Sequence, residues 1–341
     1  HVALGGDPDR MAALDNFCWP DPVLSASTPD GPYKMAQLVR ACRGLADACT
    51  AYRLPLVSGK DSMKNDANLG GRKVSIRPTL LVSLTGIVPD VRDAMTTDFK
   101  RAGDRILVVG EAVGVAVGGA PGQAAAAPLG TAGRAIVPPA PLDPADASAV
   151  LARRFELYRR LHAAISRGLC TAVHDVSDGG LAVALAESAI GGRLGARVDG
   201  ERLAGGPEPG RPGAPDGALF GERDGSFVVT CDPASLAELT QVLGDAPWVD
   251  AGEVAADPAL VVTTGDGEVR WTLDELVDAW KGFARRQGAP TAPRTVDPAR
   301  AAAGPAPGGA PSGATGTDRR SASASSRGVP LPGAPRVLIL T

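Results

Sequence analysis

The sequence lacks several features that mark common classes of protein. Its 341 residues carry a formal net charge of −3, so no surplus of lysine and arginine suggests a nucleic-acid partner. It contains no apolar run long enough to cross a bilayer, and no basic segment followed by a short apolar one of the kind that directs secretion. We therefore expect a cytoplasmic protein that binds neither nucleic acid nor a membrane.

Cysteine is scarce and irregularly placed. The chain has five cysteines, an odd number, and none of them forms a C-x-x-C pair. This usage is typical of a reduced compartment and argues against a zinc site. None of the five lies in a glycine-flanked turn with a plausible histidine partner, so the sequence predicts no cysteine nucleophile.

A Walker A sequence is also absent, but another polar segment stands out. Residues 56–66 read LVSGKDSMKND. They follow residues 31–52, whose apolar side chains recur at three and four residues and predict a helix. Gly59 lets backbone N–H groups approach an anion closely, Lys60 or Lys64 supplies positive charge, and Ser62 supplies a hydroxyl. Neighbouring aspartate and asparagine side chains offer oxygen ligands for Mg²⁺. The segment is a candidate site for a phosphorylated ligand and its metal; the alternative is a polar turn after a strand.

A second polar segment, HDVSDGG at residues 174–180, falls at an expected strand-to-helix turn. The apolar residues 169–173 before it predict a short buried strand, and the small and apolar residues 181–189 after it predict a helix. A helix N-terminus attracts anions, and carboxylates beside it can hold a cation that bridges phosphates. The alternative is that Asp178 caps the helix, but a cap does not explain His174, Asp175 and Ser177 together.

A third segment, ALDNFCWPDP at residues 13–22, places Asp15 at the expected end of an apolar strand, before a proline-bounded turn. Asp15 is a candidate ligand for a metal or a nucleotide. The alternative is a residue that simply favours the turn.

These segments resemble a known family. Together with RPTLLVSLTGIVPDV and LFGERDGSFVVT, they follow the order and spacing of the second synthetase half of phosphoribosylformylglycinamidine synthase, the amidotransferase of purine biosynthesis. The resemblance covers about residues 1 to 282. SGKDSMKND and DNFCWPDP are its specific part, whereas HDVSDGGL is shared with aminoimidazole ribonucleotide synthetase, selenophosphate synthetase and thiamine-monophosphate kinase.

The resemblance implies an α+β fold, an aminoimidazole-ribonucleotide-synthetase-like unit of two domains. Residues 1–98 would be the C-terminal part of a nucleotide-binding domain, and residues 99–285 a complete C-terminal α/β domain. Residues 286–334 are rich in alanine, proline, glycine and serine, which predicts a disordered linker. Residues 335–341 would be the first strand of a truncated glutaminase-like domain, so we expect a fragment of a longer polypeptide.

The resemblance also implies a chemistry. ATP would phosphorylate the formamide oxygen of formylglycinamide ribonucleotide, and ammonia from glutamine would displace the phosphate to give the amidine. ATP and Mg²⁺ are the expected cofactors. The expected partners are the ribonucleotide, the first synthetase half, and a glutaminase domain or subunit. No catalytic residue is expected in this chain, because the family's catalytic histidine belongs to the first half.

By the same resemblance, Asp15 and Gly59 would contact ATP, and Ser62 would contact the ribonucleotide. Lys60 would stand where short homologues have a metal-binding asparagine, and its charge could itself neutralise phosphate. In the second polar segment the resemblance makes Asp175 a ligand of Mg²⁺, and Ser177 a contact of the nucleotide phosphate.

Two alternatives stay open. This half could be a degenerate duplicate that holds a nucleotide structurally, or the chain could be a kinase-like or selenophosphate-type member of the superfamily. SGKDSMKND and the C-terminal strand argue against the latter. One departure from the family concerns residues 110–122, where the double glycine is kept but the family's acidic and aromatic residues are missing. A flexible loop is the simpler interpretation there.

Overall fold

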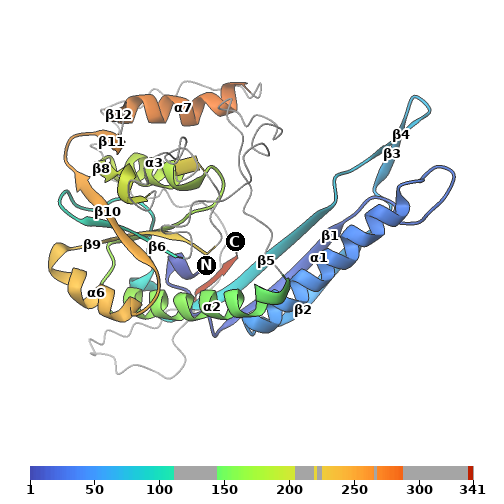
Figure 1. Cartoon of the computed structure of the whole chain (residues 1–341), viewed down its shortest axis with the longest axis horizontal. Coiled ribbons are helices and arrows are strands. Elements are labelled where there is room, and N and C mark those ends of the chain that lie inside the picture. The colour runs from blue at the N-terminus through green and yellow to red at the C-terminus, as the bar shows by residue number, and fades with distance from the viewer. Residues whose placement is uncertain (111–143, 204–218, 221–224, 265–266, 287–336, 341) are drawn as a thin grey trace, which may run out of the picture. The chain divides into compact units, whose positions relative to one another are not determined.

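The computed structural model describes residues 1–110, 144–203, 219–220, 225–264, 267–286 and 337–340 (Figure 1). By internal contacts the chain divides into two compact units, His1–Asp278 with Arg336–Thr341, and Ala279–Pro335. The described part of the second unit is the end of one helix, α7 (Leu273–Arg286). The predicted linker at 286–334 and the altered loop at 110–122 lie outside the described residues, except for their first residues.

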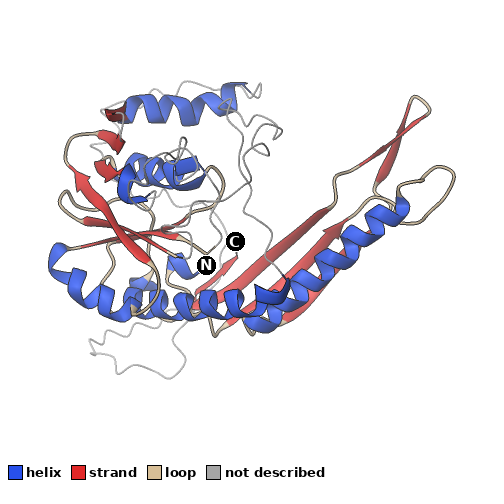
Figure 2. Cartoon of the chain, in the orientation of Figure 1, coloured by secondary structure: helices blue, strands red, loops and turns tan. Residues whose placement is uncertain are grey.

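The first sheet has four strands in the order β13, β5, β1, β2 (Figure 2). β1 (Met11–Cys18) is parallel to β2 (Leu56–Ser62) and antiparallel to β5 (Thr79–Val88). Parallel strands need a crossover, and α1 (Gly31–Ala51) supplies it. β13 (Val337–Leu340) pairs antiparallel with β5, so these residues extend the first sheet. Their assignment to a glutaminase-like domain stays a prediction.

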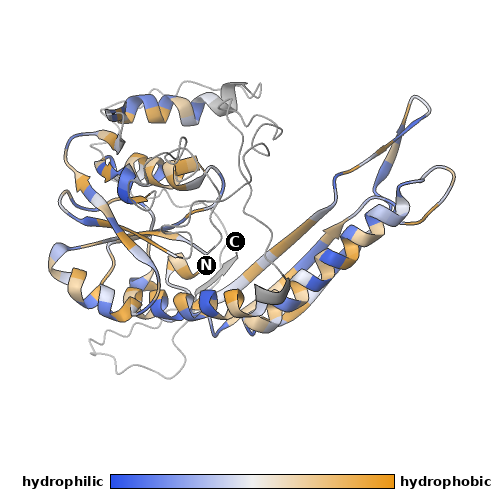
Figure 3. Cartoon of the chain, viewed as in Figure 1, coloured by the Kyte–Doolittle hydropathy of each residue, from blue (hydrophilic) through white to orange (hydrophobic). Residues whose placement is uncertain are grey.

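α1 confirms the helix predicted at residues 31–52. A proline in its first turn, where a missing N–H costs nothing, helps to start it. Hydrophobic and hydrophilic residues alternate along its length (Figure 3). The helix buries only a narrow edge, which includes Lys34, while Met35 and Val39 are both 41% exposed. Within the described structure, α1 therefore presents apolar side chains that are not covered.

A hairpin of β3 (Asp66–Leu69) and β4 (Arg72–Ser75) follows the first sheet's edge strand. It is tied to the start of α1 by the Lys34 ammonium group, which donates a hydrogen bond to the Ser75 hydroxyl at 3.0 Å. The Lys73 ammonium group lies 3.4 Å from the Asp66 carboxylate. The hairpin is thus held by charged side chains rather than by an apolar core.

The second sheet has seven strands in the order β12, β11, β8, β10, β6, β9, β7. Its pairs are antiparallel except β8 with β11, which is parallel. The strands are β6 (Arg105–Val109), β7 (Ala172–Asp175), β8 (Gly195–Asp199), β9 (Phe227–Cys231), β10 (Trp248–Ala255), β11 (Ala259–Thr264) and β12 (Gly267–Thr272). The helices are α2 (Pro144–Ser166), α3 (Gly180–Gly192), α4 (Gly200–Leu203) and α6 (Leu236–Leu243), with short 3₁₀ turns η1 (Val2–Leu4), η2 (Val91–Asp93) and η3 (Pro233–Ser235).

Both faces of this sheet are buried. Successive side chains of a strand point to opposite faces, and β6 accordingly sends Ile106 and Val108 into one apolar cluster and Leu107 and Val109 into another. α3 covers the first cluster, whereas α2 and α6 cover the second. Each fully buried leucine contributes about 1.5–3 kcal/mol to the free energy of unfolding. α2 is amphipathic, and its apolar residues pack in the second cluster.

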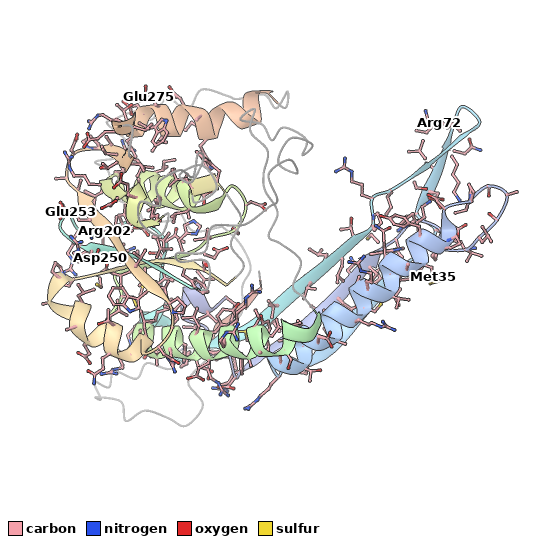
Figure 4. The ribbon with its side chains drawn as sticks, in the orientation of Figure 1. Met35, Arg72, Arg202, Asp250, Glu253 and Glu275 are labelled. Carbon is pink, nitrogen blue, oxygen red and sulfur yellow. The ribbon has the colours of Figure 1, made fainter. Side chains whose placement is uncertain are left out.

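Charged side chains connect the strands β6 and β10 of this sheet with helix α4. Three of these residues, Arg202, Asp250 and Glu253, are labelled in Figure 4. The Arg105 guanidinium on β6 donates to both carboxylate oxygens of Asp250 on β10, at 2.7 and 2.8 Å. Arg202 on α4 donates to the Asp250 backbone carbonyl at 3.3 Å, and Glu253 lies 3.6 Å from Arg105. The ionic partner of Arg202 is Asp199, 3.1 Å away. Each charged group of the cluster thus has a partner, which makes the cluster a structural one.

Candidate functional site

A cavity of about 650 Å³ lies where η1, the C-terminal end of α1, α2 and the β7–α3 turn meet. Its described lining has an aromatic part and a polar part. The aromatic part is formed by Tyr52, Phe155, Tyr158 and Phe227. The polar part is formed by Asp175, Ser177, Asp178 and Ser226. A cavity with one flat apolar wall and a few convergent polar groups is typical of small-molecule sites.

The aromatic wall is a packed cluster. The rings of Tyr52 and Phe155 are stacked with their centroids 5.9 Å apart. Tyr158 meets Tyr52 edge to face at 5.7 Å and Phe227 at 6.0 Å. Such pairs add about 0.5–1.5 kcal/mol each beyond the burial of their area. The Arg159 guanidinium lies over the Phe155 ring, 4.7 Å from its centroid. The aromatic side chains therefore hold one another in place and give this part of the cavity a fixed apolar lining.

The polar wall is built by the β7–α3 turn. Gly179 and Gly180 both have positive φ, 83° and 74°, which residues with a side chain rarely adopt. A Cβ at Gly179 would also lie 2.4 Å from a methyl carbon of Val183. The double glycine of the sequence is thus required by this turn, as the strand-to-helix prediction implies.

The α3 N-terminus has no side-chain cap. Its N-cap residue is Gly179, and no side chain there accepts a hydrogen bond from the first turn. The alternative assignment of Asp178 as the helix cap is therefore wrong; Asp178 lines the cavity instead. The Ser226 hydroxyl, in a residue only 2% exposed, has no hydrogen-bond partner among the described atoms.

Asp175 is the last residue of β7, which begins three residues later than the strand predicted at 169–173. The His174 ring, and to a lesser degree the Ser177 hydroxyl, stabilise the charged carboxylate and lower the pKa of Asp175 to about 2. Burial opposes the charged form of His174, but its hydrogen bonds to Asp175 and Glu187 outweigh burial and raise the pKa of the ring. Asp175 is therefore ionised at neutral pH, as a cation ligand must be.

The described residues contain no group of three or more histidine, cysteine, aspartate or glutamate side chains arranged to hold a metal. Mg²⁺ usually needs only one or two carboxylates, because phosphate oxygens and water complete its shell. The ionised Asp175 carboxylate in the cavity wall fits this demand. Asp175 would then hold the ion only together with a phosphorylated ligand.

The other candidate residues lie in the first sheet and not in a loop. Gly59, Lys60 and Ser62 belong to β2, so the interpretation of this segment as a polar turn is wrong. Asp15 pairs with Gly59 across the β1–β2 ladder, in the middle of β1 and not at its end as predicted. A Cβ at Gly59 would lie 2.5 Å from an oxygen of the Asp15 carboxylate, so the glycine makes room for that group. The Lys60 ammonium group donates a hydrogen bond to the Ser62 hydroxyl at 2.8 Å.

Successive side chains of a strand point to opposite faces of the sheet, so Asp15 and Lys60 lie on different faces. Asp15 shares a face of β1 with the buried Ala13 and Phe17. Burial, and to a smaller degree the charge of Asp15, raise the pKa of the Cys49 thiol on α1, so Asp15 faces that helix. Lys60 pairs with Asn16 on the opposite face.

The six predicted site residues thus lie in two separate places in the structure. Asp175 and Ser177 line the cavity, whereas none of the four first-sheet residues is among its described lining. The aromatic wall and the contact between His174 and Glu187 were missed from the sequence. Tyr52, the last residue of the predicted helix, is the one member of this aromatic cluster that the sequence placed at the end of an element.

No helix in the described part of the chain combines the length and the apolar character needed to cross a membrane.

Residues 101–265 match the family described as AIR synthase related protein, C-terminal domain.

Curated relatives carry the name phosphoribosylformylglycinamidine synthase subunit PurL. The protein from Synechococcus elongatus is 33% identical over 295 residues, 83% of this chain and 34% of its own length. The protein from Rhodopseudomonas palustris is 36% identical over 287 residues, 82% of this chain and 33% of its own. The chain therefore spans about a third of the length of these relatives.

Solved structures share the fold. PurL from Thermotoga maritima complexed with ATP superposes with a TM-score of 0.52 at 16% identity, over 81% of this chain and 38% of that one. The hydrogenase maturation protein HypE in complex with ATP gives 0.51 at 14% identity, over 81% of this chain and 77% of that one. The α+β, aminoimidazole-ribonucleotide-synthetase-like fold expected from the sequence is thereby confirmed.

Proposed function

Since this chain is a homologue of the phosphoribosylformylglycinamidine synthase subunit PurL over about a third of that subunit's length, we propose that it forms part of an ATP-dependent ligase of purine biosynthesis. The ligase converts formylglycinamide ribonucleotide to the amidine, with ammonia from glutamine. T. maritima PurL, whose fold this chain shares, is complexed with ATP in one structure and with FGAR in another.

The observation that carries the proposal is the cavity's division into an aromatic wall and a polar wall. A nucleotide presents a flat base at one end and phosphates at the other. In this proposal the base lies against the aromatic wall, the uncapped start of α3 and Ser177 contact phosphate, and Asp175 binds the Mg²⁺ that accompanies it. Bound Mg²⁺ neutralises phosphate charge in such sites.

The first-sheet residues have a separate role in the proposal. In the proposal Asp15 and Gly59 contact ATP from one face of the first sheet, outside the cavity described above. Lys60 and Ser62 lie on the opposite face, where Lys60 neutralises phosphate and Ser62 contacts the ribonucleotide. These residues would complete a site together with the first synthetase half. The described part of β2 has no strand on its outer edge, and Leu81 on β5 is 57% exposed. Such uncovered strand surface is consistent with a further domain that packs there.

A second function, holding a nucleotide without turnover, is favoured by the surroundings of His174. Both of its ring nitrogens lie within 2.9 Å of oxygen acceptors, so the ring is engaged and is poorly suited to act as a base. In this alternative the cavity contributes stability to a larger enzyme, and the catalytic groups lie in the first half.

The test is Asp175→Asn in the intact protein, with Mg-nucleotide affinity measured by calorimetry. Loss of a charged-group contact predicts a loss of roughly 1–3 kcal/mol of binding free energy. Asp245→Asn is the matched control, because Asp245 is an exposed aspartate whose partner is Arg160, outside the cavity. Unchanged affinity in the Asp175 variant would remove Asp175 from the site and contradict the proposal.

A further inference from the structure

His174 joins helix α3 to the end of strand β7. Its Nε2 lies 2.9 Å from a carboxylate oxygen of Glu187, thirteen residues further along the chain. Its Nδ1 lies 2.8 Å from the backbone carbonyl of Asp175 and 3.3 Å from that residue's carboxylate. The His174 side chain is only 12% exposed, whereas the Asp175 side chain is 57% exposed. The His174 ring is therefore fixed by its contacts and lies next to Asp175, whose carboxylate lines the cavity.

The two contacts fix the ring in both position and rotation. An imidazole bound through one nitrogen can still swing about that bond, but acceptors at both nitrogens leave a single orientation. The acceptors come from different elements, α3 and β7, so the ring also sets the distance between them. Groups that hold a metal-binding side chain in this way commonly change metal affinity by about 10–100-fold when they are removed.

We propose that His174 is a positioning residue, fixed by Glu187, which orients the Asp175 carboxylate toward the cavity for binding of a divalent cation with its nucleotide. The inference rests on the proposed function, in which Asp175 is the Mg²⁺ ligand. It assigns no chemical step to His174 itself.

The experiment measures ATP affinity by calorimetry in the intact protein, once with Mg²⁺ and once with a chelator. His174→Ala and Glu187→Ala should each lower affinity about tenfold with Mg²⁺ and leave the metal-free affinity unchanged. Glu187→Gln keeps an oxygen acceptor for the ring and should retain an affinity close to that of the wild type. A purely structural role would lower both affinities together, which would overturn the proposal.

The controls separate this inference from the proposed function. Glu238→Ala removes an ion pair of similar exposure from another helix, 50% against 43% for Glu187, and should change neither affinity. Glu187 is exposed on α3, so its variants keep the test valid even if His174→Ala fails to fold. If Asp175→Asn weakens binding but the His174 and Glu187 variants do not, the positioning role is wrong and the proposed function stands. If Asp175→Asn has no effect on affinity, the proposed function is contradicted, and the positioning role that rests on it is contradicted as well.

Discussion

Lys60 is the residue whose surroundings bear most directly on the role of this chain. It lies on an exposed strand, and its described polar contact is the 2.8 Å hydrogen bond to the Ser62 hydroxyl. Its ammonium group can therefore turn to a phosphate at little cost. A cation at this position would replace a metal ion rather than bind one.

Lys60→Met keeps much of the apolar stem and removes the charge, so bound nucleotide should be weakened. If this half is catalytic, ammonia-dependent turnover of the intact enzyme should fall with binding. If it is structural, the melting temperature in the presence of nucleotide should fall while turnover stays near the wild-type value, because ligand binding stabilises the native state. No change in either measurement would make Lys60 an ordinary solvated lysine.

The thiols offer a second test at this scale, independent of function. Cys42 is exposed, whereas burial raises the pKa of Cys170 to about 12 and that of Cys231 to about 11. Because the thiolate is the reactive form, a maleimide at pH 8 should label Cys42 rapidly and the other two only after unfolding. Mass spectrometry of the labelled peptides would check this. Labelling of native Cys170 at the rate of Cys42 would contradict the described packing.

At the scale of elements, the sequence predicted those whose residues follow a burial pattern. The helix at 31–52 and the strands that became β5, β6 and β9 show clear apolar spacing. β2 was missed because it is exposed along almost its whole length, so its residues, LVSGKDS, carry no alternation. Asp15 was misplaced for a related reason, since it interrupts the apolar residues of β1 and looks like a strand end.

The candidate site likewise has parts that could be predicted from the sequence and parts that could not. The turn at Gly179 could be predicted, because consecutive glycines between an apolar strand and a helix have few other structural uses. The contact between His174 and Glu187 could not, because it depends on how α3 packs against β7. The cavity as a whole also depends on tertiary packing, since its walls come from segments as distant as Tyr52 and Phe227.

Gly179→Ala tests the turn itself. The positive φ and the 2.4 Å approach to Val183 should together destabilise the protein by about 1–2 kcal/mol or more. In a thermal melt, each kcal/mol corresponds to a decrease of about 2–4 °C. Gly44→Ala is the control, because Gly44 lies within α1 with no atom near its missing Cβ, so alanine should be neutral or stabilising. Equal melting temperatures for the two variants would contradict the described turn.

At the scale of the whole molecule, the chain covers about a third of the length of its relatives. We expect the purified chain to show no synthetase activity with ammonia as the nitrogen donor. The measurement is release of ADP that depends on both ATP and formylglycinamide ribonucleotide. Clear substrate-dependent release would mean that the chain contains a complete active site.

The outer edge of β2 has a consequence for handling the isolated chain. Alternate residues of the seven in β2 direct their backbone N–H and C=O groups to that side, and Leu56 and Val57 add apolar side chains, 42% and 63% exposed. Such an edge is a template for strand addition by another molecule, and so for aggregation. Lys60 and Asp61, in the middle of β2, place charge where a second strand would pair. These charges disfavour strand addition at that edge and so help to keep the isolated chain in solution.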